Sequence, residues 1–143
     1  MKSSSTRRNR GFTLIEVLLV LVILVVLASL AVVAYGPIQK RANINAAKVQ
    51  IGLFKTAVSA YQLSVGSYPS TAAGLQALRS QPADLQEQGK WDGPYLDSDV
   101  PSDPWNHPYQ YACPGQHNPD SFDVWTVTPD NQQIGNWKEE TRR

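Results

Sequence analysis

The feature that most constrains this chain is a long run of apolar residues near its N-terminus. From Val17 to Ala34 every residue except Ser29 is aliphatic, and Phe12 to Ile15 extend the run to about 23 residues. An α-helix rises about 1.5 Å per residue, so a helix of this length spans a hydrocarbon core of about 30 Å. The run is apolar on all sides of such a helix, as contact with lipid or with other helices requires. The sequence therefore predicts a membrane-inserted helix over residues 12–36.

Charge is distributed very unevenly around this run. The first 11 residues hold four of the 13 basic residues and none of the 12 acids, so the remainder carries nine bases and 12 acids. Positive residues before a membrane helix predict a cytoplasmic N-terminus, with the rest of the chain on the opposite side. The formal net charge of +1 argues against a nucleic-acid partner, which usually requires a strong basic excess.

A cleaved secretory signal peptide is the simplest alternative to a retained helix. The apolar core of a signal peptide has about 7–15 residues, which is shorter than this run, and residues 35–40 lack an A-x-A cleavage pattern. We therefore expect the helix to be retained.

Glu16 is the only acidic residue among the first 83, and it lies at the start of the apolar run. An unpaired charge at the centre of a membrane helix costs about 2.5–3.5 kcal/mol, and less near an end. Glu16 either complements the N-terminal helix dipole, worth about 0.3–1 kcal/mol, or pairs with a group outside its own helix.

The apolar run is followed by a helix of different character. Pro37, beside Gly36, predicts a kink or local melting, and helical periodicity resumes over residues 38–63. Apolar residues then recur at spacings of four, three, four and three, which places them on one helix face. We expect this stripe to pack against a core; its members are Ala47, Ile51, Phe54, Val58 and Tyr61.

The C-terminal part is rich in loops, since nine of the ten prolines follow the predicted long helix. Ser70 and Thr71 offer a cap for a short helix over residues 71–79 that turns Leu75 and Leu78 inward. Alternating patterns predict strands at residues 107–112 and 122–127, with Pro/Gly-rich turns between them. The predicted fold class is α+β, with a small antiparallel sheet packed on the long helix.

Catalytic chemistry has little support in the sequence. His107 and His117 flank Cys113 but have no evident orienting group, and no glycine-rich phosphate-binding loop is present. The lone cysteine excludes an internal disulfide. We therefore expect a non-enzymatic protein with no catalytic residues.

The residues around the start of the apolar run resemble the class III leader of type IV pilins and type II secretion pseudopilins; the string is Gly11-Phe12-Thr13-Leu14-Ile15-Glu16. The resemblance implies that a prepilin peptidase removes residues 1–11 by cutting after Gly11 and methylates the new N-terminal Phe12. It also implies an assembly role for Glu16, which would neutralise the terminal amine of a neighbouring subunit.

Further strings resemble the major, G-type pseudopilins of type II secretion and occur in that family's order: Tyr68-Pro69-Ser70-Thr71, Gly93-Pro94-Tyr95-Leu96, Asp103-Pro104-Trp105 with Pro108-Tyr109-Gln110-Tyr111, and Ile134-Gly135-Asn136-Trp137. The resemblance implies a type IV pilin-like fold, with residues 12–36 as the membrane and assembly half of the long helix and 37–143 as a periplasmic domain. Pro37, Asp103, Trp105, Tyr109 and Trp137 are expected to be structural, with Asp103 capping the turn before Trp105.

By this resemblance the chain is a subunit of a periplasmic pseudopilus anchored in the bacterial inner membrane, which pushes folded exoproteins through an outer-membrane pore. The implied partners are further copies of the chain in a helical filament, minor pseudopilins, the prepilin peptidase and an inner-membrane assembly platform. Two alternatives remain open: a minor pseudopilin or type IV pilin in adhesion, motility or DNA uptake, and a membrane-anchored periplasmic binding module.

One stretch departs from the family pattern. G-type pseudopilins typically hold calcium in an acidic, glycine-rich loop, whereas residues 126–133 here contain no glycine and one carboxylate, Asp130. Calcium takes six to eight oxygen ligands. The backbone carbonyl of Val127, together with Asp130 and Asn131, forms the remaining candidate ligand set. A closed turn around Asp130 is the alternative.

Overall fold

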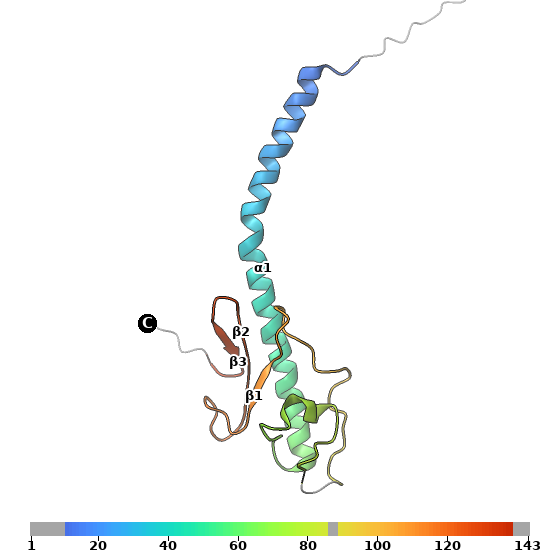
Figure 1. Ribbon diagram of the computed structural model, residues 1–143, viewed down its shortest axis with the longest axis vertical. Coiled ribbons are helices and arrows are strands. Elements are labelled where there is room, and N and C mark those ends of the chain that lie inside the picture. Colours follow the sequence, from blue (N-terminus) through green and yellow to red (C-terminus); the bar gives the residue numbers. More distant parts are fainter. Residues whose placement is uncertain (1–10, 86–88, 139–143) are drawn as a thin grey trace, which may run out of the picture. The chain divides into compact units, whose positions relative to one another are not determined.

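The computed structural model describes residues 11–85 and 89–138, with the side chains of residues 30–35 left out. Its elements are one long helix, one short 3-10 helix and three strands: α1 (Leu14–Val65), η1 (Gly74–Leu78), β1 (Gln110–Ala112), β2 (Asp123–Val127) and β3 (Gln133–Gly135) (Figure 1). The chain divides into two units, Met1–Gln39 and Lys40–Arg143.

The first unit holds the N-terminal part of α1. Thr13 caps the helix, since its backbone carbonyl accepts the amide of Glu16 at 3.1 Å and its hydroxyl lies 3.4 Å from the same amide. Helix α1 continues through Gly36 and Pro37 without interruption, so the expected local melting at Pro37 was wrong. Proline removes a single amide donor, and the turns on either side hold the backbone across that gap.

Within the part of the chain that the structure describes, no helix combines the length and apolarity needed to cross a membrane. The predicted span of residues 12–36 includes positions 30–35, whose side chains lie outside the described residues. The membrane-inserted helix therefore stays a prediction.

In the second unit, α1 contributes one face to a hydrophobic core. All five residues of the predicted stripe are at most 3% exposed, so the periodicity argument is confirmed. The face packs against side chains from η1, the sheet and the connecting segments, which include Leu75, Leu78, Tyr109, Tyr111, Phe122, Val124 and Ile134. A core of this kind stabilises the unit mainly by removing apolar surface from water.

The short helix after α1 is smaller than expected. Residues 71–73 form turns, and only Gly74–Leu78 is helical, of the 3-10 type. Gly74 has φ +57°, a left-handed conformation that a right-handed helix through residues 71–79 cannot contain. Ser70 nevertheless accepts the amide of Ala73 at 3.0 Å, and Leu75 and Leu78 point inward as predicted.

The three strands form an antiparallel sheet in the order β1-β2-β3. Tyr111 lies opposite Val124, and Thr126 lies opposite Ile134. Strand β1 is shorter than the predicted 107–112 because the carbonyl of His107 accepts the amide of Asp103 at 2.8 Å, which holds residues 103–107 in a turn. Strand β3 was not predicted. A long helix packed on a small antiparallel sheet confirms the α+β class.

Candidate functional site

The residues expected to direct processing and assembly lie at the start of α1. Gly11 and Phe12 precede the helix, Glu16 lies in its first turn, and the ring of Phe12 is 84% exposed. A Cβ added to Gly11 would meet no described atom within 4 Å. The fold of the described residues therefore gives no packing reason for glycine at this position.

The helix that follows Glu16 has no apolar partner among the described residues. Its large apolar side chains from Val17 to Leu27 are each between 49% and 68% exposed. A contiguous exposed apolar surface marks a site of contact with protein or lipid.

Asp103 organises the turn before β1 as predicted. Its side chain is buried, and one carboxylate oxygen accepts the amides of Trp105 at 2.9 Å and His107 at 2.8 Å. The other oxygen accepts the hydroxyl of Thr126 from β2. Asp103 thus joins the turn to the sheet through three hydrogen bonds, which offset the cost of burying its charge.

The aromatic residues of this region complete the core. Tyr109 is 7% exposed and meets Phe54 of α1 edge to face, with ring centroids 5.1 Å apart. Burial, and secondly the charge of Asp103, raises the pKa of Tyr109 to about 12, so its phenol stays neutral at physiological pH. Trp105 is partly buried and packs against the same core.

A second buried carboxylate, Asp123, was not anticipated from the sequence. It accepts the backbone amide of His117 at 2.7 Å, the side-chain amide of Asn118 at 2.7 Å and the backbone amide of Asn118 at 3.2 Å. Burial by itself raises the pKa of Asp123, but the hydrogen bonds from His117 and Asn118 outweigh it and lower the pKa below its usual value. Asp123 therefore holds residues 115–118 against the start of β2.

Trp137 lies over this loop and over β3. Its ring stacks on the imidazole of His117, with centroids 3.7 Å apart and planes 8° from parallel. A Cβ added to Gly135 would lie 2.2 Å from the Trp137 ring, so glycine is required for the ring to approach the strand. Each of the two histidines lies beside a buried aspartate. The Nδ1 atom of His107 is 3.8 Å from Oδ2 of Asp103, and the Nδ1 atom of His117 is 3.3 Å from Oδ2 of Asp123.

The candidate calcium ligands do not form a calcium site. The carboxylate of Asp130 is ion-paired with the ammonium of Lys40. The backbone closes into a tight turn in which the amide of Asn131 donates to the carbonyl of Thr128 at 2.8 Å. Among the described residues no three His, Cys, Asp or Glu side chains gather as a metal-binding group. A lysine beside the lone carboxylate opposes a divalent cation, so Val127, Asp130 and Asn131 do not fit calcium.

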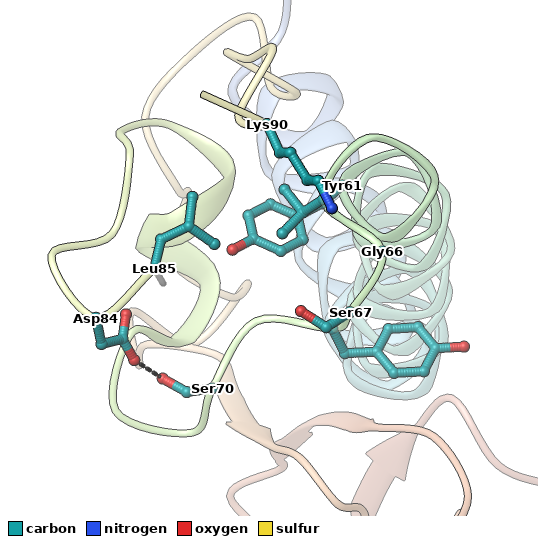
Figure 2. A pocket seen from close by; sticks show the side chains of 9 residues that line it. Tyr61, Gly66, Ser67, Ser70, Asp84, Leu85 and Lys90 are labelled. Atoms are coloured by element: carbon teal, nitrogen blue, oxygen red, sulfur yellow. Dashed lines mark hydrogen bonds between the residues drawn. The ribbon is translucent and has the colours of Figure 1, made fainter. Parts of the chain in front are cut away.

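A pocket of about 490 Å³ lies beside the end of α1 (Figure 2). Tyr61 and Leu85 face each other in it, and the hydroxyl of Ser70 donates to Asp84 at 2.5 Å. The same Ser70 oxygen accepts the amide of Ala73, so it is engaged as both donor and acceptor. Burial, followed by the charge of Asp84, raises the pKa of Tyr61. The hydrogen bonds of Ser70 therefore hold the segment between Ser70 and Asp84 beside α1, and they do not activate the Ser70 hydroxyl as a nucleophile.

The chain matches two family models in neighbouring segments that do not overlap. Residues 6–32 match the prokaryotic N-terminal methylation motif. Residues 35–141 match type II secretion system protein G. The chain belongs to the type II secretion system protein G family. The match includes the sheet, the buried carboxylates and the Trp137 contact described above, so the expected family is confirmed.

Named relatives agree with the protein G assignment over nearly the whole chain. The type II secretion system core protein G of Pseudomonas aeruginosa is 36% identical over 139 residues, which cover 92% of this chain and 96% of the relative. That of Klebsiella pneumoniae is 38% identical over 137 residues, covering 92% and 96%. Neither the pilin nor the binding-module alternative gains support from these protein G relatives.

A solved pseudopilin structure supports the fold. The crystal structure of the major pseudopilin from the type 2 secretion system of enterohaemorrhagic Escherichia coli aligns with a TM-score of 0.62 at 29% identity. The alignment covers 72% of this chain and 93% of that one. The type IV pilin-like architecture expected for a protein G chain is thereby confirmed.

Proposed function

We propose that this protein is a structural subunit of the periplasmic pseudopilus of a type II secretion system. The observation that carries the proposal is the exposed apolar part of α1, Val17 to Leu27, which lies within the segment that matches the methylation motif. The membership of the protein G family supports the same function.

The exposed helix requires other helices or lipid around it. Burying one large aliphatic side chain is worth about 1.5–3 kcal/mol, and every large apolar residue from Val17 to Leu27 is at least 49% exposed. Lipid around a membrane helix meets this need before assembly, and the helices of neighbouring copies meet it in a filament. Two such environments of similar polarity allow a subunit to leave the membrane and enter the filament.

Processing precedes assembly in this proposal. A prepilin peptidase cuts after Gly11, where the described fold leaves space for any side chain, and Phe12 becomes the methylated N-terminus. The basic leader keeps the N-terminus cytoplasmic, residues 12–36 cross the inner membrane, and residues 37–143 lie in the periplasm. Minor pseudopilins and an inner-membrane platform are the proposed assembly partners, and filament growth pushes folded exoproteins outward.

Intact-mass analysis of the protein purified from its host membranes tests this proposal. We expect a mass that corresponds to loss of residues 1–11 and gain of one methyl group. A full-length precursor, or cleavage at a site after residue 16, would contradict the proposed processing.

We expect Glu16→Ala to be processed normally but to lower filament yield by tenfold or more. The carboxylate of Glu16 is proposed to pair with the terminal amine of Phe12 on a neighbouring copy, and an unpaired amine in an apolar filament is strongly unfavourable. Crosslinking in cells, read as a ladder of homo-oligomers, measures the effect. Ser29→Ala serves as the control within the same run. An undiminished ladder from processed Glu16→Ala would rule out this role for Glu16.

A further inference from the structure

We propose that Lys40 serves as a built-in cation for the turn between β2 and β3, in place of calcium. Its ammonium neutralises Asp130 and fastens the turn to α1. The second unit therefore keeps this turn in position at any calcium concentration. The ion pair belongs to the folded unit, so this role of Lys40 does not depend on the assembly of copies.

The turn between β2 and β3 closes through its own hydrogen bonds. The amide of Thr128 donates to the carbonyl of Gln132 at 2.9 Å, and the amide of Asn131 donates to the carbonyl of Thr128 at 2.8 Å. Thr128 is buried, and its hydroxyl accepts the amide of Gln132 at 3.1 Å. Asn131 has φ +62°, a left-handed conformation that asparagine adopts more readily than most residues. These groups give the turn its shape without a metal ion.

The charge in the turn matches a single monovalent cation. Asp130 is the only acidic residue from Thr126 to Gln133, and its carboxylate pairs with the ammonium of Lys40. One negative and one positive charge leave the pair neutral. A calcium ion on the same carboxylate would add two positive charges beside a lysine, and it would have to take most of its six to eight oxygen ligands from uncharged groups. The charge balance therefore favours the ammonium.

The ion pair joins two segments that lie far apart in the sequence. Lys40 belongs to α1 and is the first residue of the second unit, whereas Asp130 lies in the turn that follows β2. Among the described residues, the buried apolar side chains of α1 begin at Ala47, about two helical turns beyond Lys40. The pair therefore holds the turn against the helix where the buried core no longer does so. Joining separate segments in this way is what a structural metal ion does in other proteins.

The exposure of the ion pair sets the size of its effect. Both side chains are more than half exposed, so the pair shifts an opening equilibrium of the turn by roughly 1.5- to 5-fold, and salt weakens it. The occupancy of a calcium site follows the calcium concentration of the medium, whereas a lysine in the same chain is always present beside its partner. We therefore expect the turn to respond to ionic strength but not to calcium in particular.

Thermal melting of the full chain in detergent tests the independence from calcium. We expect the melting temperatures in excess chelator and in millimolar calcium chloride, at matched ionic strength, to differ by less than about 1 °C, because an ion that does not bind the folded state cannot stabilise it. A rise of several degrees in calcium chloride that sodium chloride of the same ionic strength does not reproduce would overturn the proposal.

Hydrogen exchange of the backbone amides of residues 128–132 tests the ion pair. Lys40→Met and Asp130→Asn, each alone, are expected to speed exchange by roughly 1.5- to 5-fold at low salt. The double variant should exchange no faster than either single variant, because both changes remove the same contact. Arg41→Met is the matched control, since Arg41 is an exposed basic residue next to Lys40 on α1, and we expect it to leave the exchange rates unchanged.

A reversed ion pair separates charge pairing from other effects of substitution. Lys40→Asp combined with Asp130→Lys again places opposite charges together, and we expect slower exchange than in Lys40→Asp or Asp130→Lys alone. Exchange rates unchanged by Lys40→Met would overturn the role of Lys40. Effects of Lys40→Met and Asp130→Asn that simply add in the double variant would overturn it as well, because the two residues would then act separately.

Discussion

Replacing Phe54 with alanine is expected to lower the free energy of unfolding of the second unit by about 3–5 kcal/mol. Phe54 is fully buried at the centre of the α1 stripe, and its ring meets Tyr109 edge to face. Removal of the ring leaves a cavity between the helix and the C-terminal segment that rigid neighbours cannot fill. Such a loss is a large part of the 5–15 kcal/mol that stabilises a typical domain.

Urea unfolding of the full chain in detergent, followed by tryptophan fluorescence, measures this effect. Leu53→Ala is the matched control, because Leu53 is adjacent in sequence but 55% exposed, and we expect it to change the free energy by less than about 0.5 kcal/mol. Similar losses from the two variants would contradict the packing of α1 described above.

Asp123→Asn is expected to destabilise the unit by about 2–3 kcal/mol at pH 7, with an effect that depends on pH. Hydrogen bonds to a charged group contribute about 1.5–3 kcal/mol each, and the amides of His117 and Asn118 donate to this carboxylate. Asparagine keeps an acceptor but loses the charge. The hydrogen bonds outweigh desolvation and lower the pKa of Asp123 in the folded state.

The sign of the pH dependence follows from that lowered pKa. Asp123 stabilises the fold fully above its unfolded pKa of about 3.9, and this contribution is lost as the pH falls through the lower folded value. The difference in unfolding free energy between wild type and Asp123→Asn should therefore shrink below about pH 4. Urea titrations at pH 7, 4 and 3 measure it, with the exposed Asp120→Asn as control. An equal difference at pH 7 and 3 would show that the charge of Asp123 is not the stabilising element.

The parts of the fold that could be predicted are those fixed by local sequence. Helical periodicity placed Ile51, Phe54 and Val58 in the core, because a 3.6-residue repeat directly reports which face is buried. The cap at Asp103 was also predictable, since it binds amides within four residues of itself. Strand β3 was not, because three residues carry too little alternation to be distinguished from a turn.

The candidate site also has parts that could be predicted from local sequence and parts that could not. The residues proposed for processing and assembly, Gly11, Phe12 and Glu16, lie within one six-residue string and could be proposed from sequence alone. The stacking of Trp137 on His117 could not, because it joins a residue beyond the sheet to a loop that precedes β2. Asp123 was missed for a related reason: its partners are in a loop that precedes the strand, and the strand pattern alone gives no indication of them.

The distribution of buried side chains has a consequence for subunit exchange. Every buried apolar side chain that the structure describes lies at or beyond Ala47, within the second unit. In the proposed pseudopilus, folding and assembly are then separable equilibria, since folding uses one set of side chains and the proposed transfer of the N-terminal helix between lipid and filament uses another. A subunit could enter or leave the filament many times without refolding. Filament length would then be set by the concentration of subunits in the membrane rather than by the stability of the folded unit.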